Sequence, residues 1–243
     1  MRRIGAAIAA RLAREGWALA LHNAHGGDPD PDLTQALMEH SVRWHGFIAD
    51  LGDEASRAAL LPAVAVHFGV LPTLLINNAA LFETDDAVSI GAEKLAEHQA
   101  VNLNAPVLLA TQLARALPAG ARACVINILD QRIAQPHGDQ LSYTLSKQAL
   151  AAATQTLARA LAPHVRVNAV APGLTLPTPD YAPDHWAHLA TLMPLGALPK
   201  PVAIADAVAY LAGAEHTTGQ IIFVDGGAHL RAFERDFIHL TRD

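Results

Sequence analysis

Three polar side chains, Asp130, Tyr143 and Lys147, have the types and spacing of a proton-transfer site. Tyr143 and Lys147 are four residues apart in a segment with helical periodicity, so both point from the same face of one helix. A nearby ammonium favours phenolate, and we expect it to lower the pKa of Tyr143 from about 10 toward the working pH of a general acid. Asp130 follows an apolar run typical of a buried strand. The pattern predicts acid–base chemistry; a Tyr and a Lys exposed on a helix surface are the alternative.

The elements that must position these residues alternate between strand and helix spacing. Strands are predicted at residues 17–21, 42–49, 74–76, 123–129, 165–170 and 220–224. Helices are predicted at residues 4–15, 32–40, 53–68, 141–161 and 202–212, with one or two helices around Pro106 at residues 93–117. This order predicts βαβ units in an α/β fold, a single doubly wound Rossmann-type domain with a mostly parallel sheet, over residues 1–243. Ligands of such sheets bind at the carboxyl ends of the strands, where Asp130 lies.

The composition excludes several classes of protein. Hydrophobic residues make up 51% of the 243 residues and charged residues 16%, which excludes a disordered chain, and 50 alanines indicate closely packed helices. The net charge of -6, with no basic cluster, favours a small-molecule substrate over nucleic acid. No apolar run reaches the ~20 residues that span a bilayer, so we expect no membrane partner. Cys124 is alone and lies in an apolar run, so we expect a buried thiol and a cytoplasmic protein.

Several short motifs accompany the Tyr143–Lys147 pair. They are Asn77-Asn78-Ala79 after a predicted strand, Asn102 on the following helix, Pro172-Gly173 after a later strand, and Asp225-Gly226-Gly227 near the end. Together with Tyr143 and Lys147 they resemble the short-chain dehydrogenase/reductase family, and the resemblance runs from Arg2 to about Leu230. It implies that Tyr143 is the proton donor, that Lys147 holds the nicotinamide ribose and tunes Tyr143, and that Asn102 supports a water-linked proton path.

The resemblance also implies a nicotinamide cofactor. An acidic residue at the end of the second family strand would bind the adenosine 2′-hydroxyl, but this strand ends at His22 and Asn23 with no acid before Asp28. NADP is therefore favoured, with His22, Asn23 and Arg3 near its phosphate and Asp50 and Leu51 near its adenine. The expected cofactor-binding residues are Arg3, Ile4, His22, Asn23, Asp50, Leu51, Asn78, Ala79, Tyr143, Lys147, Pro172 and Gly173.

Asp130 departs from the family pattern, which usually has serine there. A carboxylate would repel a developing alkoxide by about 4 kcal/mol at 4 Å, or roughly a thousandfold in rate, whereas it suits a substrate with ring N–H and amino donors. The pteridine reductase and dihydromonapterin reductase branch has this aspartate, and Arg3 and Phe82 match its arginine and its stacking aromatic. Ala80 and Leu81 stand where that branch has a serine. The expected substrate-binding residues are Arg3, Phe82, Asp130, Tyr143 and Leu176.

Three functions follow as hypotheses. The first is an NADPH-dependent pterin reductase that reduces a dihydropteridine C=N bond, with Tyr143 as proton donor. The second is a general carbonyl reductase for a 3-oxoacyl thioester or a sugar, in which Asp130 is a neutral acid or points away. The third is a non-catalytic NADP-binding protein.

The third hypothesis is motivated by the start of the chain. The resemblance implies a first central strand and a glycine of the phosphate loop ahead of Arg2, and neither is in the sequence. We expect a break in the middle of the sheet, an incomplete pyrophosphate cradle, and a natural start about ten residues upstream. We also expect a proline-rich, irregular segment at residues 173–199 that forms a substrate lid, no metal site despite His185 and His188, and a homotetramer assembled through the helices at 93–117 and 141–161.

Overall fold

The computed structural model describes residues 3–177 and 181–240. All of its strand pairings are parallel, and they form a two-stranded and a four-stranded sheet. In sheet order the strands are β1 (Leu19–Asn23) and β2 (Trp44–Ile48), then β3 (Leu74–Asn77), β4 (Ala123–Ile128), β5 (Val165–Pro172) and β6 (Ile221–Val224). The prediction of an α/β fold with parallel strands is confirmed.

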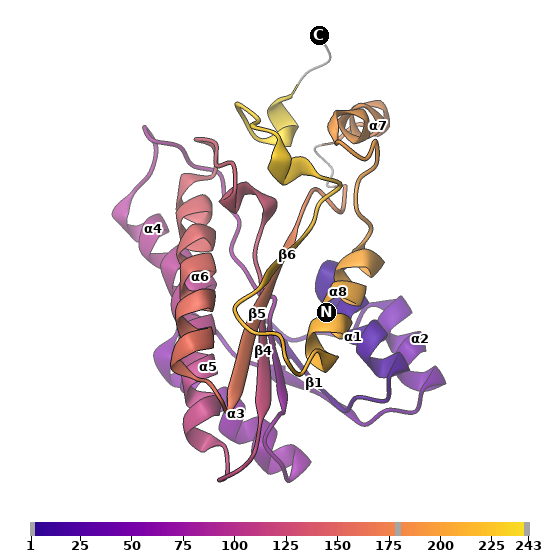
Figure 1. Cartoon of the computed structure of the whole chain (residues 1–243), viewed down its shortest axis with the longest axis vertical. Coiled ribbons are helices and arrows are strands. Elements are labelled where there is room, and N and C mark those ends of the chain that lie inside the picture. Colours follow the sequence, from indigo (N-terminus) through magenta and orange to yellow (C-terminus); the bar gives the residue numbers. More distant parts are fainter. Residues whose placement is uncertain (1–2, 178–180, 241–243) are drawn as a thin grey trace.

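Helices cover both faces of the sheets (Figure 1). One layer holds α1 (Arg3–Arg14), α2 (Pro31–Glu39) and α8 (Pro201–Gly213), with α1 packed along α8. The other layer holds α3 (Glu54–Phe68), α4 (Ala92–Gln99), α5 (Ala105–Ala116) and α6 (Leu141–Ala160). In the part of the chain that the structure describes, every helix is too short or too polar to cross a membrane.

Strand β4 is the most enclosed strand. All six of its residues are buried, because β3 and β5 flank it and helices cover both faces. Its one amide, Asn127, is satisfied: its Oδ1 accepts from Asn77 at 2.8 Å and its Nδ2 donates to Thr154 at 2.9 Å. Burial raises the pKa of the Cys124 thiol, as expected of an inert structural cysteine.

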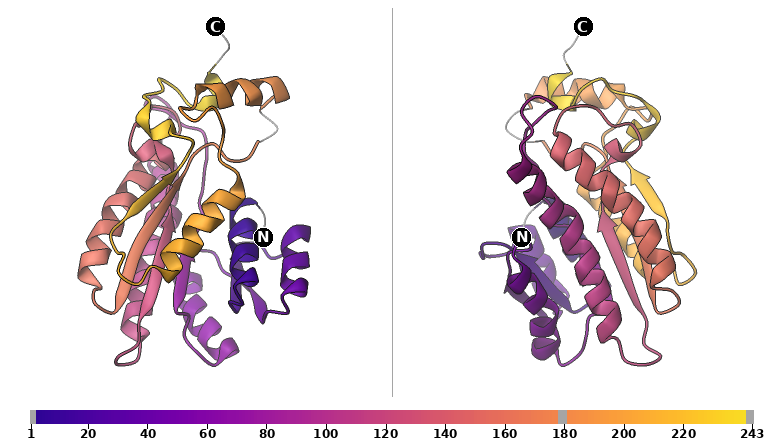
Figure 2. Two further views of the ribbon diagram at one scale, coloured as in Figure 1. Left: turned by 45° about the vertical axis from the view of Figure 1, so that its right-hand side comes forward. Right: turned by 90° about the vertical axis from the view of Figure 1, so that its left-hand side faces the viewer.

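A gap separates the two sheets. In the described residues no ladder joins β1 to β3, and a cavity of about 580 Å³ lies between them. Its walls include Leu19 and Leu21 of β1 and Leu74 and Ile76 of β3. Figure 2 shows β1 and β2 set apart from the other strands. The break expected in the middle of the sheet is confirmed.

Two details differ from the predicted elements. The proline-rich stretch, expected to be irregular, contains helix α7 (Pro183–Leu192), whose proline stands at its first turn, where an N–H is not needed. The one or two helices predicted at 93–117 are the two helices α4 and α5, and the π-helical turn that joins them, Ala100–Asn104, was not predicted. Pro106 has no N–H to donate to the carbonyl of Asn102, so the regular helical bond is absent there. The Ala105 N–H donates to the carbonyl of Ala100, five residues back, which is the bond of a π-helix.

Candidate active site

The Tyr143 hydroxyl faces the Asp130 carboxylate. Asp130 directly follows β4, and Tyr143 lies in the first turn of α6. The phenol hydroxyl donates to Asp130 Oδ2 at 3.1 Å, and the Tyr143 side chain is largely buried, at 7% exposure. The Asp130 side chain keeps 21% exposure, so the carboxylate also reaches the solvent-accessible edge of the sheet. The predicted proximity of these two groups is confirmed.

Lys147 lies one helical turn beyond Tyr143 on the same face of α6. Its Nζ is 5.6 Å from the centre of the Tyr143 ring and donates to the Ile128 carbonyl at 2.7 Å. Burial lowers the pKa of Lys147 to about 8, while the negative charge of Asp130 opposes that shift. The same-face prediction is therefore confirmed, and the ammonium is anchored to the end of β4.

The expected pKa of Tyr143 is wrong in direction. Burial raises its pKa well above 10, and the Asp130 carboxylate raises it further. The nearby Arg132 guanidinium opposes both effects without overcoming them. The rule that a cation at i+4 favours phenolate neglects the cost of charging a buried phenol beside a carboxylate. Tyr143 therefore holds its proton, and its role as proton donor remains a prediction.

Asn102 ties the substrate-side loop to α6 from within the π-helical turn. It is fully buried; its Oδ1 accepts from the Leu81 N–H at 2.8 Å, and its Nδ2 donates to the Leu81 carbonyl at 2.9 Å. The same Nδ2 donates to Ser146 Oγ at 3.0 Å. The amide therefore fixes the backbone immediately before Phe82. A part of Asn102 in a proton path remains a prediction.

Phe82 lies at the site rather than in the core. Its ring meets Tyr143 edge to face, with centroids 4.8 Å apart, and the residue is 55% exposed. An exposed aromatic ring beside the Tyr143 phenol offers a face on which a planar ring can stack. The structure therefore brings together three of the five residues expected to bind substrate: Phe82, Asp130 and Tyr143.

The other two, Arg3 and Leu176, line a separate cavity of about 600 Å³ between α1, α2 and the segment after β5. The expected lid at 173–199 contains α7, and its residues 178–180 lie outside the described part of the chain. Leu189 and Met193 are buried against Phe237, so this segment packs on the C-terminal residues.

Two buried charged residues at the site escaped the sequence analysis. Asp85 is 4% exposed and accepts from the Ser142 N–H at 3.1 Å and from its hydroxyl, so it caps α6 from the loop that carries Phe82. Arg132, in a short 3-10 turn (Gln131–Ile133), pairs with Asp130 and with Asp236. In the sequence, only the position of Arg132 two residues after Asp130 could have indicated it.

No metal site was expected at His185 and His188, and the His185 ring has a partner within the chain. His185 bonds through Nε2 to the Leu240 carbonyl at 2.7 Å. Over residues 3–177 and 181–240, no group of three or more metal-ligating side chains comes together.

Comparisons with known proteins identify the family of this chain. A family model described as enoyl-(acyl carrier protein) reductase matches residues 1–229. A structure titled FolM alternative dihydrofolate reductase 1 from Brucella canis, complexed with NADP, is 36% identical with a TM-score of 0.86 and covers 98% of this chain and 94% of its own. The chain belongs to the short-chain dehydrogenase/reductase family. It is an oxidoreductase of that family.

Other short-chain dehydrogenase/reductase relatives are not named as dihydrofolate reductases. The putative ketoacyl reductase 2 of the granaticin polyketide synthase from Streptomyces violaceoruber is 32% identical and covers 93% of this chain and 92% of its own. A short-chain dehydrogenase/reductase structure from Serratia marcescens is 33% identical, with a TM-score of 0.82 and 93% of each chain covered. Membership of the family therefore leaves the substrate open.

The residues expected to bind a dinucleotide lie along the edge where ligands of short-chain dehydrogenases/reductases are expected. Asn23, Asp50, Asn78 and Pro172 stand at or just after the carboxyl ends of β1, β2, β3 and β5. His22 and Leu51 flank two of these positions, Ala79 follows Asn78, Gly173 follows β5, and Arg3 and Ile4 begin α1.

Some of these side chains have local partners. His22 Nε2 lies 2.8 Å from the Ala49 carbonyl, Asn23 Oδ1 accepts from the His25 N–H at 3.1 Å, and Asp50 Oδ1 accepts from the Gly52 N–H at 2.8 Å. These contacts fix the loops at the strand ends. A cofactor would therefore contact the exposed backbone of these loops and the side-chain atoms that have no partner among these contacts. Their cofactor roles remain predictions.

Proposed function

We propose that this chain is an NADPH-dependent reductase of a pterin-type substrate, which reduces a dihydropteridine C=N bond. The observation that carries the proposal is the Asp130 carboxylate 3.1 Å from the Tyr143 hydroxyl, beside the exposed Phe82 ring. A carboxylate at this place suits N–H donors, and an aromatic face suits a flat heterocycle. The solved relative titled alternative dihydrofolate reductase, with NADP bound, supports the same substrate class.

The edge of the sheet fits a dinucleotide. The N-terminus of α1 lies against Asn78, since a Cβ on Gly5 would be 2.8 Å from Asn78 Nδ2. Such a helix terminus presents free N–H groups to a phosphate. At the end of β5 a Cβ on Gly173 would be 2.7 Å from the Asp225 backbone, so only glycine allows this close approach. When bound, NADPH supplies the hydride.

The chain's own residues then manage orientation and the proton. The Phe82 ring stacks on the heterocycle, and Asp130 accepts hydrogen bonds from its amino and ring N–H groups. Tyr143, whose pKa is raised by burial, gives its proton to the ring nitrogen next to the carbon that receives hydride. The Tyr143 hydrogen, which is directed to Asp130 Oδ2, turns to the ring nitrogen once the substrate N–H groups donate to that carboxylate. Hydride and proton together saturate the C=N bond.

A ketone reductase is the second candidate, and one contact favours it. The Arg132 guanidinium pairs with Asp130 at 3.2 Å, which offsets part of the negative charge that would repel an alkoxide. The granaticin ketoacyl reductase relative supports this alternative. The non-catalytic hypothesis is favoured only by the gap between β1 and β3.

One assay separates the three. NADPH oxidation is measured with dihydrobiopterin, dihydromonapterin and dihydrofolate, and in parallel with a β-keto thioester. We expect turnover of at least one pterin, and Asp130→Ser should lower it while thioester turnover holds or rises. Silence with every pterin alongside robust thioester turnover would support the ketone reductase. NADPH binding without any turnover would support the non-catalytic protein.

We also propose that the chain assembles as a homotetramer through α4, α5 and α6. Leu108 on α5 and Leu145 on α6 are large apolar residues with 43% and 41% exposure. Light scattering of the protein and of a Leu108→Glu, Leu145→Glu variant tests this. A monomeric mass for the unmodified protein would contradict it.

A further inference from the structure

Arg132 is a charged side chain enclosed by the proposed site. Its side chain is 5% exposed, and it lies in the loop between β4 and α6. An arginine stays protonated in proteins, so its burial requires partners for the charge and for several N–H donors. The partners identify what Arg132 does.

On one side Arg132 holds Asp130. The Asp130 Oδ1 atom accepts from the Arg132 backbone N–H at 2.9 Å and from its Nε at 3.2 Å. The other oxygen, Oδ2, is the one that faces the Tyr143 hydroxyl. The two oxygens of one carboxylate therefore have separate partners, and Arg132 determines which oxygen is directed to the phenol.

The guanidinium also lies against both aromatic rings of the site. Its central carbon is 5.1 Å from the centre of the Tyr143 ring and 5.5 Å from the centre of the Phe82 ring. A planar guanidinium at this range is attracted to the faces of aromatic rings. A single side chain thus contacts the acceptor, the proton donor and the stacking ring.

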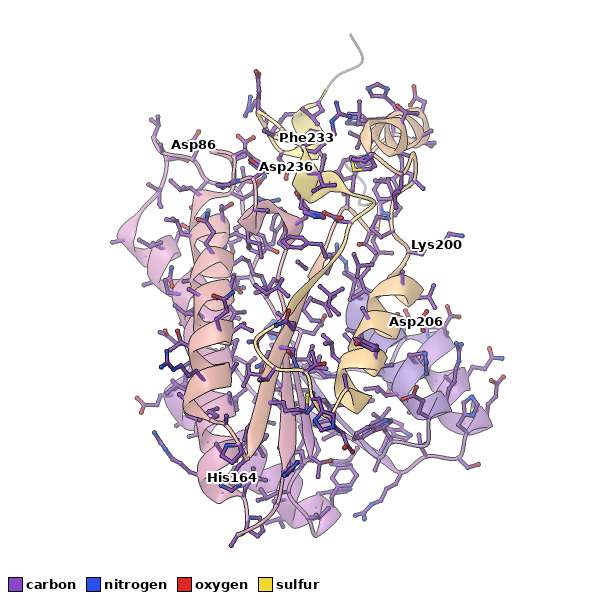
Figure 3. All side chains as sticks on the ribbon, in the orientation of Figure 1. Asp86, His164, Lys200, Asp206, Phe233 and Asp236 are labelled. Carbon is purple, nitrogen blue, oxygen red and sulfur yellow. The ribbon has the colours of Figure 1, made fainter. Side chains whose placement is uncertain are left out.

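The other end of the guanidinium is fixed by residues distant in sequence. Nη2 donates to Asp236 Oδ2 at 2.9 Å, and Nη1 donates to Gln140 Oε1 at 3.1 Å. Asp236 is 5% exposed, and its own N–H donates to Asp139 at 2.8 Å. Figure 3 shows Asp236 in the C-terminal segment with Phe233, at the same end of the molecule as Asp86. These bonds hold the guanidinium in place through partners other than Asp130.

We propose that Arg132 is the positioning residue of the substrate side: it sets Asp130, Tyr143 and Phe82 in one arrangement, and Asp236 fixes it from behind. The positioning role rests on the proposed function in one respect: it requires that Asp130, Tyr143 and Phe82 face the substrate. The extended fork of arginine is required, because the compact ammonium of lysine cannot reach Asp130 and Asp236 on its two sides and also contact both rings.

A double-mutant cycle tests the proposal. Wild type, Arg132→Met, Asp130→Ser and the double variant are compared by kcat, KM and melting temperature. A small misplacement of reacting groups costs about a hundredfold, so Arg132→Met should lower kcat by about that factor with little change in KM for NADPH. If Arg132 acts through Asp130, the double variant is no slower than the slower single variant. Multiplied losses would overturn the proposal.

Arg132→Lys covers the case in which the methionine variant fails to fold, because it keeps the charge. It should lower the melting temperature less than Arg132→Met does, yet still lose most of kcat; full activity would overturn the proposal. Arg235→Met is the matched control, since Arg235 pairs with Asp139 at 2.8 Å but is 57% exposed and contacts none of the three site residues. It should keep kcat within about twofold.

Failure of the pterin function and failure of this proposal are distinct. If wild type reduces only the β-keto thioester, the pterin function fails, and the same cycle is measured on the thioester. Coupling between Arg132 and Asp130 there supports the positioning role, and independent losses overturn it.

Discussion

The two parts of the sheet differ in how completely they are enclosed. In the β3–β6 part, β4 has six buried residues and hydrogen-bonded neighbours on both sides. In the β1–β2 part, four of the five β2 residues are exposed, and β1 borders a cavity of about 580 Å³ on the side that faces β3. Asp130, Tyr143 and Lys147 all belong to the first part. The groups proposed to transfer the proton thus have a buried support, whereas the edge expected to hold the cofactor phosphates adjoins the gap.

The largest expected effect is a loss of turnover when Tyr143, in the enclosed β3–β6 part, is replaced. Tyr143→Phe removes the proton donor but keeps the ring that meets Phe82 edge to face. We expect kcat to fall by about a thousandfold, within the range of a lost general acid. NADPH affinity, measured by fluorescence titration, should change less than threefold, roughly the size of one lost hydrogen bond.

Tyr210→Phe is its matched control, because Tyr210 is 62% exposed on α8, away from the site. It should leave kcat unchanged. Retention of turnover by Tyr143→Phe would show that the proton comes from another group, and the proposed mechanism would then fail.

The next effect compares core truncations in the two parts. Ile126 of β4 is fully buried between Ile76 and Asn168, so Ile126→Ala should lower the free energy of unfolding by about 2–5 kcal/mol. Leu21 of β1 lines the existing cavity and already lacks neighbours on that side, so Leu21→Ala should cost about 1–2 kcal/mol. Urea unfolding measures both. Equal losses would mean that the two parts are equally well packed.

A smaller effect should follow from filling the gap. An extension ahead of residue 1, with about five β-branched residues and a glycine turn, has the length of one strand. Pairing with β1 and β3 should raise stability by about 2 kcal/mol, after the entropy of ordering the strand offsets much of the apolar burial. It should also tighten NADPH binding. A Gly/Ser extension of the same length should do neither. No gain over that control would show that the gap is not a strand site.

Much of this organisation was accessible from local sequence pattern. The i,i+4 spacing of Tyr143 and Lys147 and the strand end before Asp130 are properties of short segments, and the structure confirms them. Arg132 and Asp85 were missed because their partners are distant: Asp236 is 104 residues from Arg132, and Ser142 is 57 residues from Asp85. Only folding brings these loops together.

The wrong pKa direction has the same origin. An i+4 cation can be identified in a helix, but the burial that dominates the Tyr143 shift comes from the whole packed domain. Helix α7 was missed for a related reason: prolines indicate irregular backbone unless, as at Pro183, they stand in a first helical turn.

The smallest effect is a pH dependence that comes from burial in the enclosed part. Burial lowers the pKa of Lys147 to about 8, so the side chain loses its ammonium charge above that pH. If the ammonium holds the cofactor ribose, kcat/KM for NADPH should fall about tenfold between pH 7 and pH 9. The group is harder to charge when folded than when unfolded, so its destabilising contribution near pH 7 should diminish as pH rises from 8 toward 10.5. Lys147→Arg, which stays charged, should lack the fall near pH 8; a flat wild-type profile up to pH 9.5 would remove Lys147 from cofactor binding.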